Sequence, residues 1–383
     1  MTSMKQRAGG MPKQPGLARH DSAVLDLAFA LDCTASMGSY IETARRNIKN
    51  IVEAIVSSEK SDVKLALVEY RDHPPQDVTF VTRAHNFTSS VSSVRKWLEG
   101  CKAQGGGDTP EAVTDALHDI LKLSWRETST KICVLISDAP PHGLHSQGDT
   151  FPDGCPAGLD PMAIVRQMAE KGITLYCVGC EPAIIPYKEF FTAIAFLTGG
   201  QYVPLRGAKA LTQIIVGGAQ EEMSLERWMA EVDREVQQET KDGHEVDEKA
   251  VSKKIAAKLK VKGARSKTLM RNNTVLKEAS MFSKVLSKCK SMAQIKGKFM
   301  LAALPSFGGS KKKSVHKGRK KTSTKKGRPV KKGRKGKTTC CRKRKLAGTT
   351  ETKEEDYTTV ESAISHSQIL RMVRKSKARG KKK

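Results

Sequence analysis

The sequence predicts an α/β protein with a doubly wound, mostly parallel central sheet and helices on both of its faces. Short, near-continuous apolar segments such as Leu25–Leu31 alternate with segments of helical spacing such as Ser39–Ser57. Strands that are apolar along their whole length are typical of a parallel sheet buried on both faces. In such open sheets, ligands bind beyond the carboxyl ends of the strands, where the strand order reverses.

The elements follow one another in the order that this fold class requires. After the first strand and helix, the pattern predicts strands at Val63–Tyr70, Val78–Ala84, Lys131–Ser137, Ile173–Val178 and Gln201–Leu205. Helical spacing recurs at Val91–Cys101, Pro110–Leu123, Pro161–Lys171, Tyr187–Thr198 and from Leu211 to about Gln238.

Charge divides the 383-residue chain into two parts. Residues 1–240 carry 24 Lys and Arg against 30 Asp and Glu, whereas residues 241–383 carry 44 against 10. The first part is therefore an ordinary, slightly acidic protein, and the second is a polycation suited to an anionic partner. We expect a disordered N-terminus at 1–21, an α/β domain at 22–240, a basic helical appendage at 241–305 and a disordered Lys- and Arg-rich tail at 306–383. The appendage has helical spacing at Val246–Val261 and Leu276–Ala303, and a short helix is expected in the tail at Val360–Val373.

The sequence also excludes some classes of protein. Met1 to His20 holds no apolar stretch of the kind that a secretory signal needs, and no later segment is long and apolar enough to span a bilayer. Most of the nine cysteines stand in apolar runs, which indicates buried thiols in a reducing compartment. The CxxC pair Cys177 and Cys180 has no matching second pair, so a zinc or redox role is not expected there.

Three loops carry oxygen side chains at strand ends. The first is Asp32-Cys-Thr34-Ala-Ser36, directly after the first strand; the second is the glycine-rich Gly105-Gly-Gly-Asp-Thr-Pro-Glu111. The third is Asp138-Ala-Pro-Pro-His142, after the most hydrophobic strand. Each loop alone also fits helix caps or plain turns. Together they would meet at one edge of the sheet, and an oxygen-only set suits Mg²⁺ above other ions.

These loops resemble the metal-ion-dependent adhesion site of the von Willebrand factor type A domain, over about residues 23–222. The resemblance implies that Asp32, Thr34 and Ser36 bind Mg²⁺ (or Mn²⁺ or Ca²⁺). Most members add a threonine, here Thr109, whereas the integrin β version of the second loop coordinates through its glutamate, here Glu111. The last aspartate, often acting through water, corresponds to Asp138. One coordination position stays with water, which a partner's Asp or Glu carboxylate can replace.

The integrin-like subgroup also implies a second cation close by. Asp72 and Asp108 match its carboxylates, but Gly106 stands where integrins place an asparagine. The residues of the three loops are most similar to A domains of intracellular proteins that often carry an alpha-type protein kinase domain. Residues 241–383 show no kinase core, so kinase activity is not carried over.

The basic tail offers an interface for a polyanion. Nineteen Lys and Arg stand between residues 311 and 345 without one acidic residue. Within them, Gly-Arg-Pro flanked by lysines is similar to the AT-hook that enters the minor groove of A·T-rich DNA. A generic polybasic tail, for nuclear import or unspecific polyanion binding, is the alternative. The candidate contact residues are Lys325, Lys326, Arg328, Lys331, Lys332 and Arg334.

The combined expectation is a non-enzymatic, intracellular protein of the cytoplasm, the nucleus or both. Its A domain would capture an acidic protein ligand through Mg²⁺, while its tail would hold a nucleic acid or another polyanion. The alternatives are an accessory member of an alpha-type kinase family and a chromatin-associated, AT-hook-like DNA-binding protein.

Overall fold

The computed structural model describes residues 21–59, 61–144, 147–241, 246–303 and 355–379. Six strands form the central sheet in the order β3-β2-β1-β4-β5-β6, and only β3 at the edge is antiparallel to its neighbour. The strands are β1 (Asp21–Asp32), β2 (Asp62–Tyr70), β3 (Thr82–Thr88), β4 (Ser129–Ser137), β5 (Ile173–Cys180) and β6 (Gln201–Leu205). The predicted doubly wound, mostly parallel fold is therefore confirmed.

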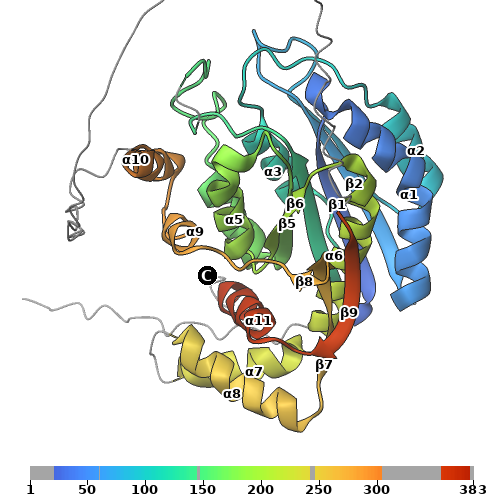
Figure 1. Cartoon of the computed structure of the whole chain (residues 1–383), viewed down its shortest axis with the longest axis vertical. Coiled ribbons are helices and arrows are strands. Elements are labelled where there is room, and N and C mark those ends of the chain that lie inside the picture. Colours follow the sequence, from blue (N-terminus) through green and yellow to red (C-terminus); the bar gives the residue numbers. More distant parts are fainter. Residues whose placement is uncertain (1–20, 60, 145–146, 242–245, 304–354, 380–383) are drawn as a thin grey trace, which may run out of the picture. The chain divides into compact units, whose positions relative to one another are not determined.

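Helices cover both faces of this sheet, as Figure 1 shows for α1 and α2 on one side and α5 on the other. Side chains of β1 alternate between the two cores: Leu27 and Phe29 pack on the side of α1, α2 and α6, and Ala28 and Ala30 on the side of α3, α4 and α5. The helices are α1 (Gly38–Glu59), α2 (Val91–Gly100), α3 (Val113–Lys122), α4 (Pro161–Glu170), α5 (Lys188–Leu197) and α6 (Leu211–Glu226).

The order of the sheet fixes where a ligand site can form. The chain passes from β1 to β2 on one side, and β4 then pairs with β1 on the other side. The order therefore reverses between β1 and β4, which is the switch point at which ligands bind in open α/β sheets. Asp32 ends β1, and Asp138 directly follows β4.

Four sequence-based boundaries need correction. The helix expected from Leu211 to about Gln238 is two helices, α6 and α7 (Met229–Lys241), with a turn at Arg227 and Trp228 between them. The third strand covers Thr82–Thr88 instead of Val78–Ala84, because the segment before it is a loop in which Val78 is 83% exposed. The helix expected from Pro110 starts only at Val113. The helix expected at Leu276–Ala303 is two helices, α9 (Met281–Leu286) and α10 (Met292–Ala303), and Ser280 caps the start of the first.

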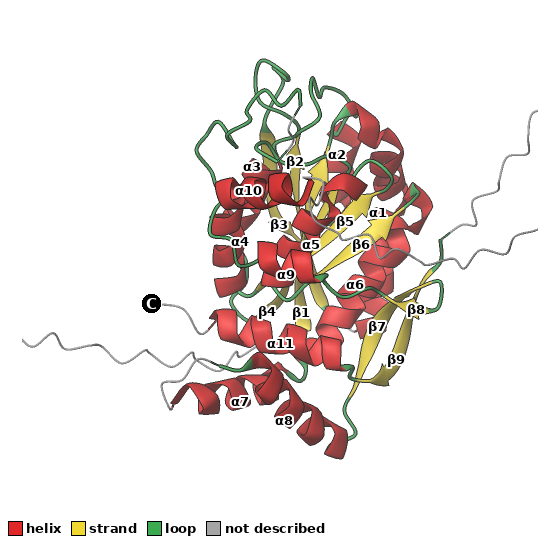
Figure 2. Ribbon diagram, turned by 60° about the vertical axis from the view of Figure 1, so that its left-hand side comes forward, coloured by secondary structure: helices red, strands yellow, loops and turns green. Residues whose placement is uncertain are grey.

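The region after the sheet is not purely helical. Helices α7 (Met229–Lys241) and α8 (Glu248–Val261) are followed by a three-stranded sheet of order β8-β7-β9, which Figure 2 shows apart from the central sheet. Its strands are β7 (Arg265–Arg271), β8 (Thr274–Val275) and β9 (Tyr357–Ala363).

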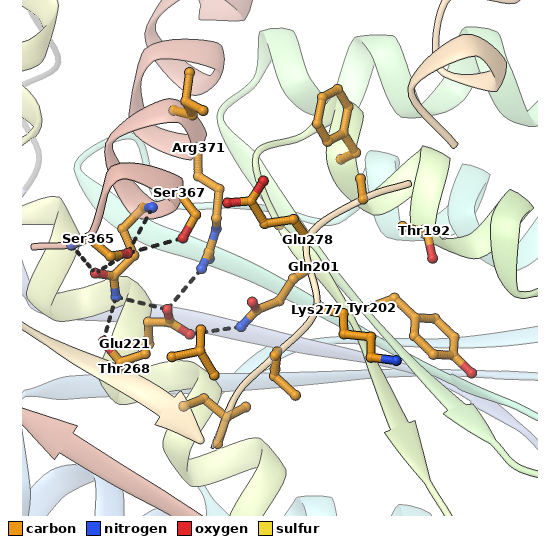
Figure 3. A pocket seen from close by; sticks show the side chains of 18 of the residues that line it. Thr192, Gln201, Tyr202, Glu221, Thr268, Lys277, Glu278, Ser365, Ser367 and Arg371 are labelled. Atoms are coloured by element: carbon orange, nitrogen blue, oxygen red, sulfur yellow. Dashed lines mark hydrogen bonds and ion pairs between the residues drawn. The ribbon is translucent and has the colours of Figure 1, made fainter. Parts of the chain in front are cut away.

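Residues 355–379 correct part of the expected disordered tail of 306–383. They hold a strand, β9, and then a helix that starts at His366 instead of the expected Val360. Strand β9 pairs with β7, and α11 (His366–Arg379) packs on α7 and α8 through Ile369, Met372 and Val373. Arg371 of α11 is buried against Glu221 of α6, beside a cavity of about 60 Å³ (Figure 3). The final segment is ordered because it buries apolar side chains and pairs its charges, which the basic composition concealed. Residues 304–354 lie outside the described residues.

Candidate metal centre

The first loop is shaped around the buried side chain of Asp32. Its Oδ1 accepts hydrogen bonds from the Thr34 hydroxyl over 2.6 Å and from the Thr34 N–H over 3.0 Å. The Thr34 and Ser36 hydroxyl oxygens lie 3.3 Å apart. Asp32 and Thr34 are buried, whereas Ser36 is exposed. The three oxygen side chains therefore form a cluster that runs from the sheet edge to the surface.

The glycine-rich loop crosses this cluster. Gly105 and Gly106 have φ of +84° and +81°, which L side chains rarely adopt. A Cβ built on Gly106 would lie 2.8 Å from Oε1 of Glu111 and 3.4 Å from Cβ of Thr34. Glycine at this position thus leaves the space between Thr34 and Glu111 open.

Glu111 points into the same place and is buried. Its backbone N–H donates to the carbonyl of Pro140 over 2.9 Å, so the second loop is fixed to the third. Its Oε2 is buried and has no hydrogen-bond partner among the described residues. Burial, followed by the charges of Asp32, Asp72, Asp108 and Asp138, raises the pKa of Glu111 to about 11.

Asp138 completes the group from the end of β4. It is partly buried, its carboxylate accepts a hydrogen bond from Ser36, and burial raises its pKa. Burial first, and the charge of Asp138 second, raises the pKa of Asp32 to about 7. The structure therefore brings Asp32, Thr34, Ser36, Glu111 and Asp138 together. Thr109 is exposed in the loop.

The chemistry of this donor set fits a hard divalent cation. All the side chains offer oxygen, and Glu111 keeps a buried oxygen unpartnered within the described part of the chain. Crowded carboxylates repel one another, and a cation between them removes that repulsion.

A second cluster lies beside the first. Asp72, Asp108 and His142 can each place one ligand atom within 4.8 Å of the others. Oδ1 of Asp72 is 2.7 Å from Nε2 of His142, and Oδ2 of Asp72 and Oδ1 of Asp108 are buried without a partner among the residues described. The other ring nitrogen of His142 lies 2.8 Å from Asp149.

His142 has a place at the site that its sequence position does not reveal. A histidine at a loop end is more often a surface or structural residue, yet His142 is only 2% exposed. Burial acts against its charge, but hydrogen bonds with Asp149 and Asp72 raise its pKa to about 9. A protonated His142 would place a positive charge between two carboxylates, where the integrin-like comparison expected a second metal ion.

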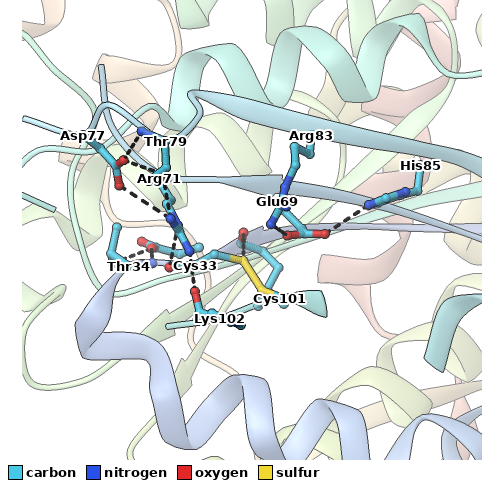
Figure 4. Close-up of a disulfide and its surroundings, with 12 residues drawn as sticks. Cys33, Thr34, Glu69, Arg71, Asp77, Thr79, Arg83, His85, Cys101 and Lys102 are labelled. Carbon is cyan, nitrogen blue, oxygen red and sulfur yellow. Dashed lines mark hydrogen bonds and ion pairs between the residues drawn. A yellow bond between two sulfur atoms is a disulfide. The ribbon is translucent and has the colours of Figure 1, made fainter. Parts of the chain in front are cut away.

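Arg71 and a disulfide hold the loops in place (Figure 4). Nε of Arg71 donates to the carbonyl of Cys33 over 3.2 Å, and Nη2 donates to the carbonyl of Lys102 over 2.6 Å. Cys33 and Cys101 form a disulfide, so the expectation of buried thiols in a reducing compartment does not hold for this pair. The first loop is therefore fixed to the chain just before the glycine-rich loop. The free cysteines among the described residues are Cys133, Cys155, Cys177, Cys180 and Cys289.

The comparisons with known proteins agree with this architecture. Residues 26–196 match the family model of the von Willebrand factor type A domain. This segment is a von Willebrand factor type A (VWA) domain. The VWA domain here also has the doubly wound, mostly parallel sheet that the sequence predicted.

Two curated relatives share part of the chain. Alpha-protein kinase vwkA from Dictyostelium discoideum is 32% identical over 160 residues, which cover 40% of this chain and 25% of the kinase. Mediator of RNA polymerase II transcription subunit 25 from Homo sapiens is 27% identical over 182 residues, 43% of this chain and 24% of that protein. The chain thus spans about a quarter of the length of these relatives. A solved von Willebrand factor type A structure from Catenulispora acidiphila covers 53% of this chain and 43% of its own, with 15% identity and a TM-score of 0.38.

Two other expectations from the sequence concern the basic tail and membrane-spanning segments. Lys325, Lys326, Arg328, Lys331, Lys332 and Arg334 lie outside the described residues. None of the helices that the structure describes has the length and apolar character needed to cross a bilayer.

Proposed function

We propose that the VWA domain binds a protein partner through a divalent cation. Asp32, Thr34, Ser36 and Glu111 would hold Mg²⁺, or Mn²⁺ or Ca²⁺ in its place, and Asp138 would act on the ion directly or through water. The cation supplies a Lewis-acidic position that a carboxylate of the partner can occupy. The observation that carries the proposal is the buried, unpartnered Oε2 of Glu111 among the described residues, beside the Asp32–Thr34–Ser36 cluster.

Either Thr109 or Glu111 could be the ligand that the second loop supplies, and the geometry favours Glu111. Its carboxylate is buried and close to Thr34, as the short approach of a Gly106 Cβ to both residues indicates. Thr109 is exposed, so it would have to turn inward to reach the ion. The second loop would then act as in integrin β subunits, with the glutamate as a ligand.

A binding role is favoured over catalysis. The family match and the similarity to a Mediator subunit both fit a non-enzymatic protein. The similarity to an alpha-protein kinase supports an alternative, in which the chain is an accessory partner of such a kinase inside the cell. We propose an intracellular location, in the cytoplasm, the nucleus or both, on the same similarities.

The test measures Mg²⁺ binding to the full chain by isothermal titration calorimetry and partner capture with and without EDTA. We expect Glu111→Gln to weaken Mg²⁺ binding at least tenfold and to abolish EDTA-sensitive capture. Asp153→Asn is the matched control, because the Asp153 side chain is fully exposed outside the cluster. Capture that is unchanged by EDTA would contradict the proposal.

We further propose that the basic tail binds nucleic acid or another polyanion through its Lys- and Arg-rich stretch at 311–345. Its charge supports this, because each neutralised phosphate contributes about −0.9 to the slope of log K against log salt on duplex DNA. Affinity for A·T-rich and G·C-rich duplexes, measured between about 50 and 200 mM salt, separates an AT-hook from a generic polybasic tail. Binding that does not change with salt would contradict both versions.

A further inference from the structure

Three side chains of different chemistry meet next to the candidate metal centre. None of them is among the oxygen ligands proposed for that centre. His73 comes from the loop between β2 and β3, Asp115 from the first turn of α3, and Cys155 from the loop before α4. Nε2 of His73 is 3.0 Å from Oδ2 of Asp115. Sγ of Cys155 is 3.3 Å from the same oxygen and 3.9 Å from Nε2 of His73.

These distances fit the edges of a tetrahedral zinc site. Zn–S of about 2.3 Å with Zn–N and Zn–O of about 2.0–2.1 Å places neighbouring tetrahedral ligand atoms about 3.3–3.6 Å apart. The three observed separations are 3.0, 3.3 and 3.9 Å, so shifts of a few tenths of an ångström would complete the geometry. Imidazole, thiolate and carboxylate are all zinc ligands, whereas thiolate does not suit Mg²⁺.

The surroundings of the cluster are built to hold it. His73 and Asp115 are buried, and the edge of the Phe151 ring lies against the His73 ring, with centroids 5.8 Å apart. Burial, followed by the charge of Asp115, raises the pKa of the Cys155 thiol to about 11, and hydrogen bonds from the backbone N–H groups of Leu159 and Ala157 act against this rise. A bound divalent cation would displace the thiol proton, because thiolate is the form of cysteine that binds metal.

A Cys-His-Asp catalytic arrangement does not fit the same geometry. In a catalytic triad the acid binds one ring nitrogen of the histidine, and the nucleophile uses the other. Here Asp115 and Cys155 both face Nε2 of His73, and Cys155 is closer to the carboxylate than to the ring. All three ligand atoms instead converge on one point.

We propose that His73, Asp115 and Cys155 bind one Zn²⁺ ion, with water or another small ligand in the fourth position. The ion would join the loop after β2, the first turn of α3 and the loop before α4. It would also fix the loop that carries Asp149, and thereby the position of His142 beside Asp72. The zinc site is thus distinct in chemistry from the oxygen-lined centre.

The experiment titrates chelator-treated full-chain protein with ZnCl₂ and, separately, with CoCl₂. Cys340 and Cys341, outside the described residues, are replaced by Ser in every sample so that they cannot supply thiolate. We expect one Zn²⁺ per chain, a thiolate-to-Co²⁺ charge-transfer band in the near ultraviolet, and a higher unfolding temperature with Zn²⁺. Cys155→Ser should remove the Co²⁺ band and weaken Zn²⁺ binding at least tenfold.

Three further variants distinguish this site from the remaining thiols and from the oxygen-lined centre. Cys289→Ser removes a free thiol elsewhere and should leave the Co²⁺ band intact. Asp32→Ala should abolish Mg²⁺ binding without changing the Zn²⁺ stoichiometry, so the two sites can fail separately. If Cys155→Ser does not fold, as judged by circular dichroism, Asp115→Asn replaces it. Absence of the Co²⁺ band in the parent protein, or a band that survives both substitutions, would overturn the proposal.

Discussion

One carboxylate oxygen of Asp32 accepts both hydrogen bonds that Thr34 can offer, from its hydroxyl over 2.6 Å and from its backbone N–H over 3.0 Å. The backbone bond shapes the turn after β1, and the hydroxyl bond sets the direction of the Thr34 oxygen. The pair therefore fixes two of the proposed ligands before any cation arrives. Such preorganisation lowers the free energy that cation binding would otherwise spend on ordering side chains.

Thr34→Val tests this arrangement, since it keeps the size and β-branching of the side chain but removes the hydroxyl. A hydrogen bond to a charged group contributes about 1.5–3 kcal/mol, so we expect Mg²⁺ affinity to fall about tenfold or more. Thr34→Ser retains the hydroxyl and should stay within about threefold of the parent. Calorimetric titration of both variants measures the difference, and equal affinities would show that the Thr34 oxygen is not a ligand.

Gly106→Ala should disturb the metal centre in two ways: by straining the backbone at a positive φ and by filling space beside Glu111. A residue forced to positive φ costs on the order of 1–2 kcal/mol, and the new Cβ would lie 2.8 Å from Oε1 of Glu111. Gly148→Ala is the matched control, because Gly148 has φ +75° with open space around it. We expect both variants to lose similar stability in urea unfolding, but only Gly106→Ala to lose Mg²⁺ binding. Full Mg²⁺ affinity in Gly106→Ala would place the cation elsewhere.

The fold was predictable because the alternation of apolar strands with helical spacing is repeated along the chain. The candidate metal centre was predictable because Asp32 and Asp138 both stand at strand ends. The sequence could not show that the His142 side chain points into the protein. Its ring lies between Asp72, 70 residues earlier in the chain, and Asp149, 7 residues later. The pairing of Cys33 with Cys101 likewise depends on where α2 ends. Composition gave a wrong expectation for α11. Arg371 and Lys375 suggest a solvent-exposed helix, but both are buried in ion pairs with carboxylates of α6.

The stability of the metal-free domain should depend on pH with a definite sign. The folded-state pKa of Asp32 is about 7 and that of Glu111 about 11, both above their usual values near 4. At these two groups the folded protein binds more protons than the unfolded chain, from about pH 4 up to about 7 at Asp32 and up to about 11 at Glu111. Their contribution to the free energy of unfolding therefore falls as pH rises through these ranges. Mg²⁺ replaces these protons, and its stabilising effect should be larger at about pH 8 than at pH 5. Thermal unfolding with EDTA or Mg²⁺ at both values measures this; an effect of Mg²⁺ independent of pH would contradict it.

Cys101→Ser should destabilise the domain and loosen the first loop. Cysteines 68 positions apart close a long loop, for which chain entropy predicts about 4 kcal/mol of stabilisation. Urea unfolding of the variant should show this loss, and dithiothreitol should reproduce it in the parent but not add to it in Cys101→Ser. Cys133→Ser, at a free buried cysteine, shows how much a serine alone costs in this core.

Arg371→Met should release the C-terminal helix from the VWA domain. The guanidinium of Arg371 is buried between α11 and α6, where Nη1 lies 2.9 Å from Glu221 and Nη2 contacts Glu222. Without Arg371 the buried carboxylate of Glu221 loses its ion pair, whereas Glu222 keeps its pair with Lys375. Removing one partner of a buried pair costs about 3–5 kcal/mol.

Arg265→Met serves as the control for this substitution, because it breaks an ion pair with Glu361 in which both side chains are 59% exposed. Exposed pairs contribute about 0–1 kcal/mol, so this variant should unfold close to the parent in urea. Limited proteolysis of Arg371→Met should in addition cut within 357–379, since β9 and α11 depend on this anchor. If both variants lose the same small amount of stability, α11 is held by the apolar contacts of Ile369 and Met372 and not by its buried charges.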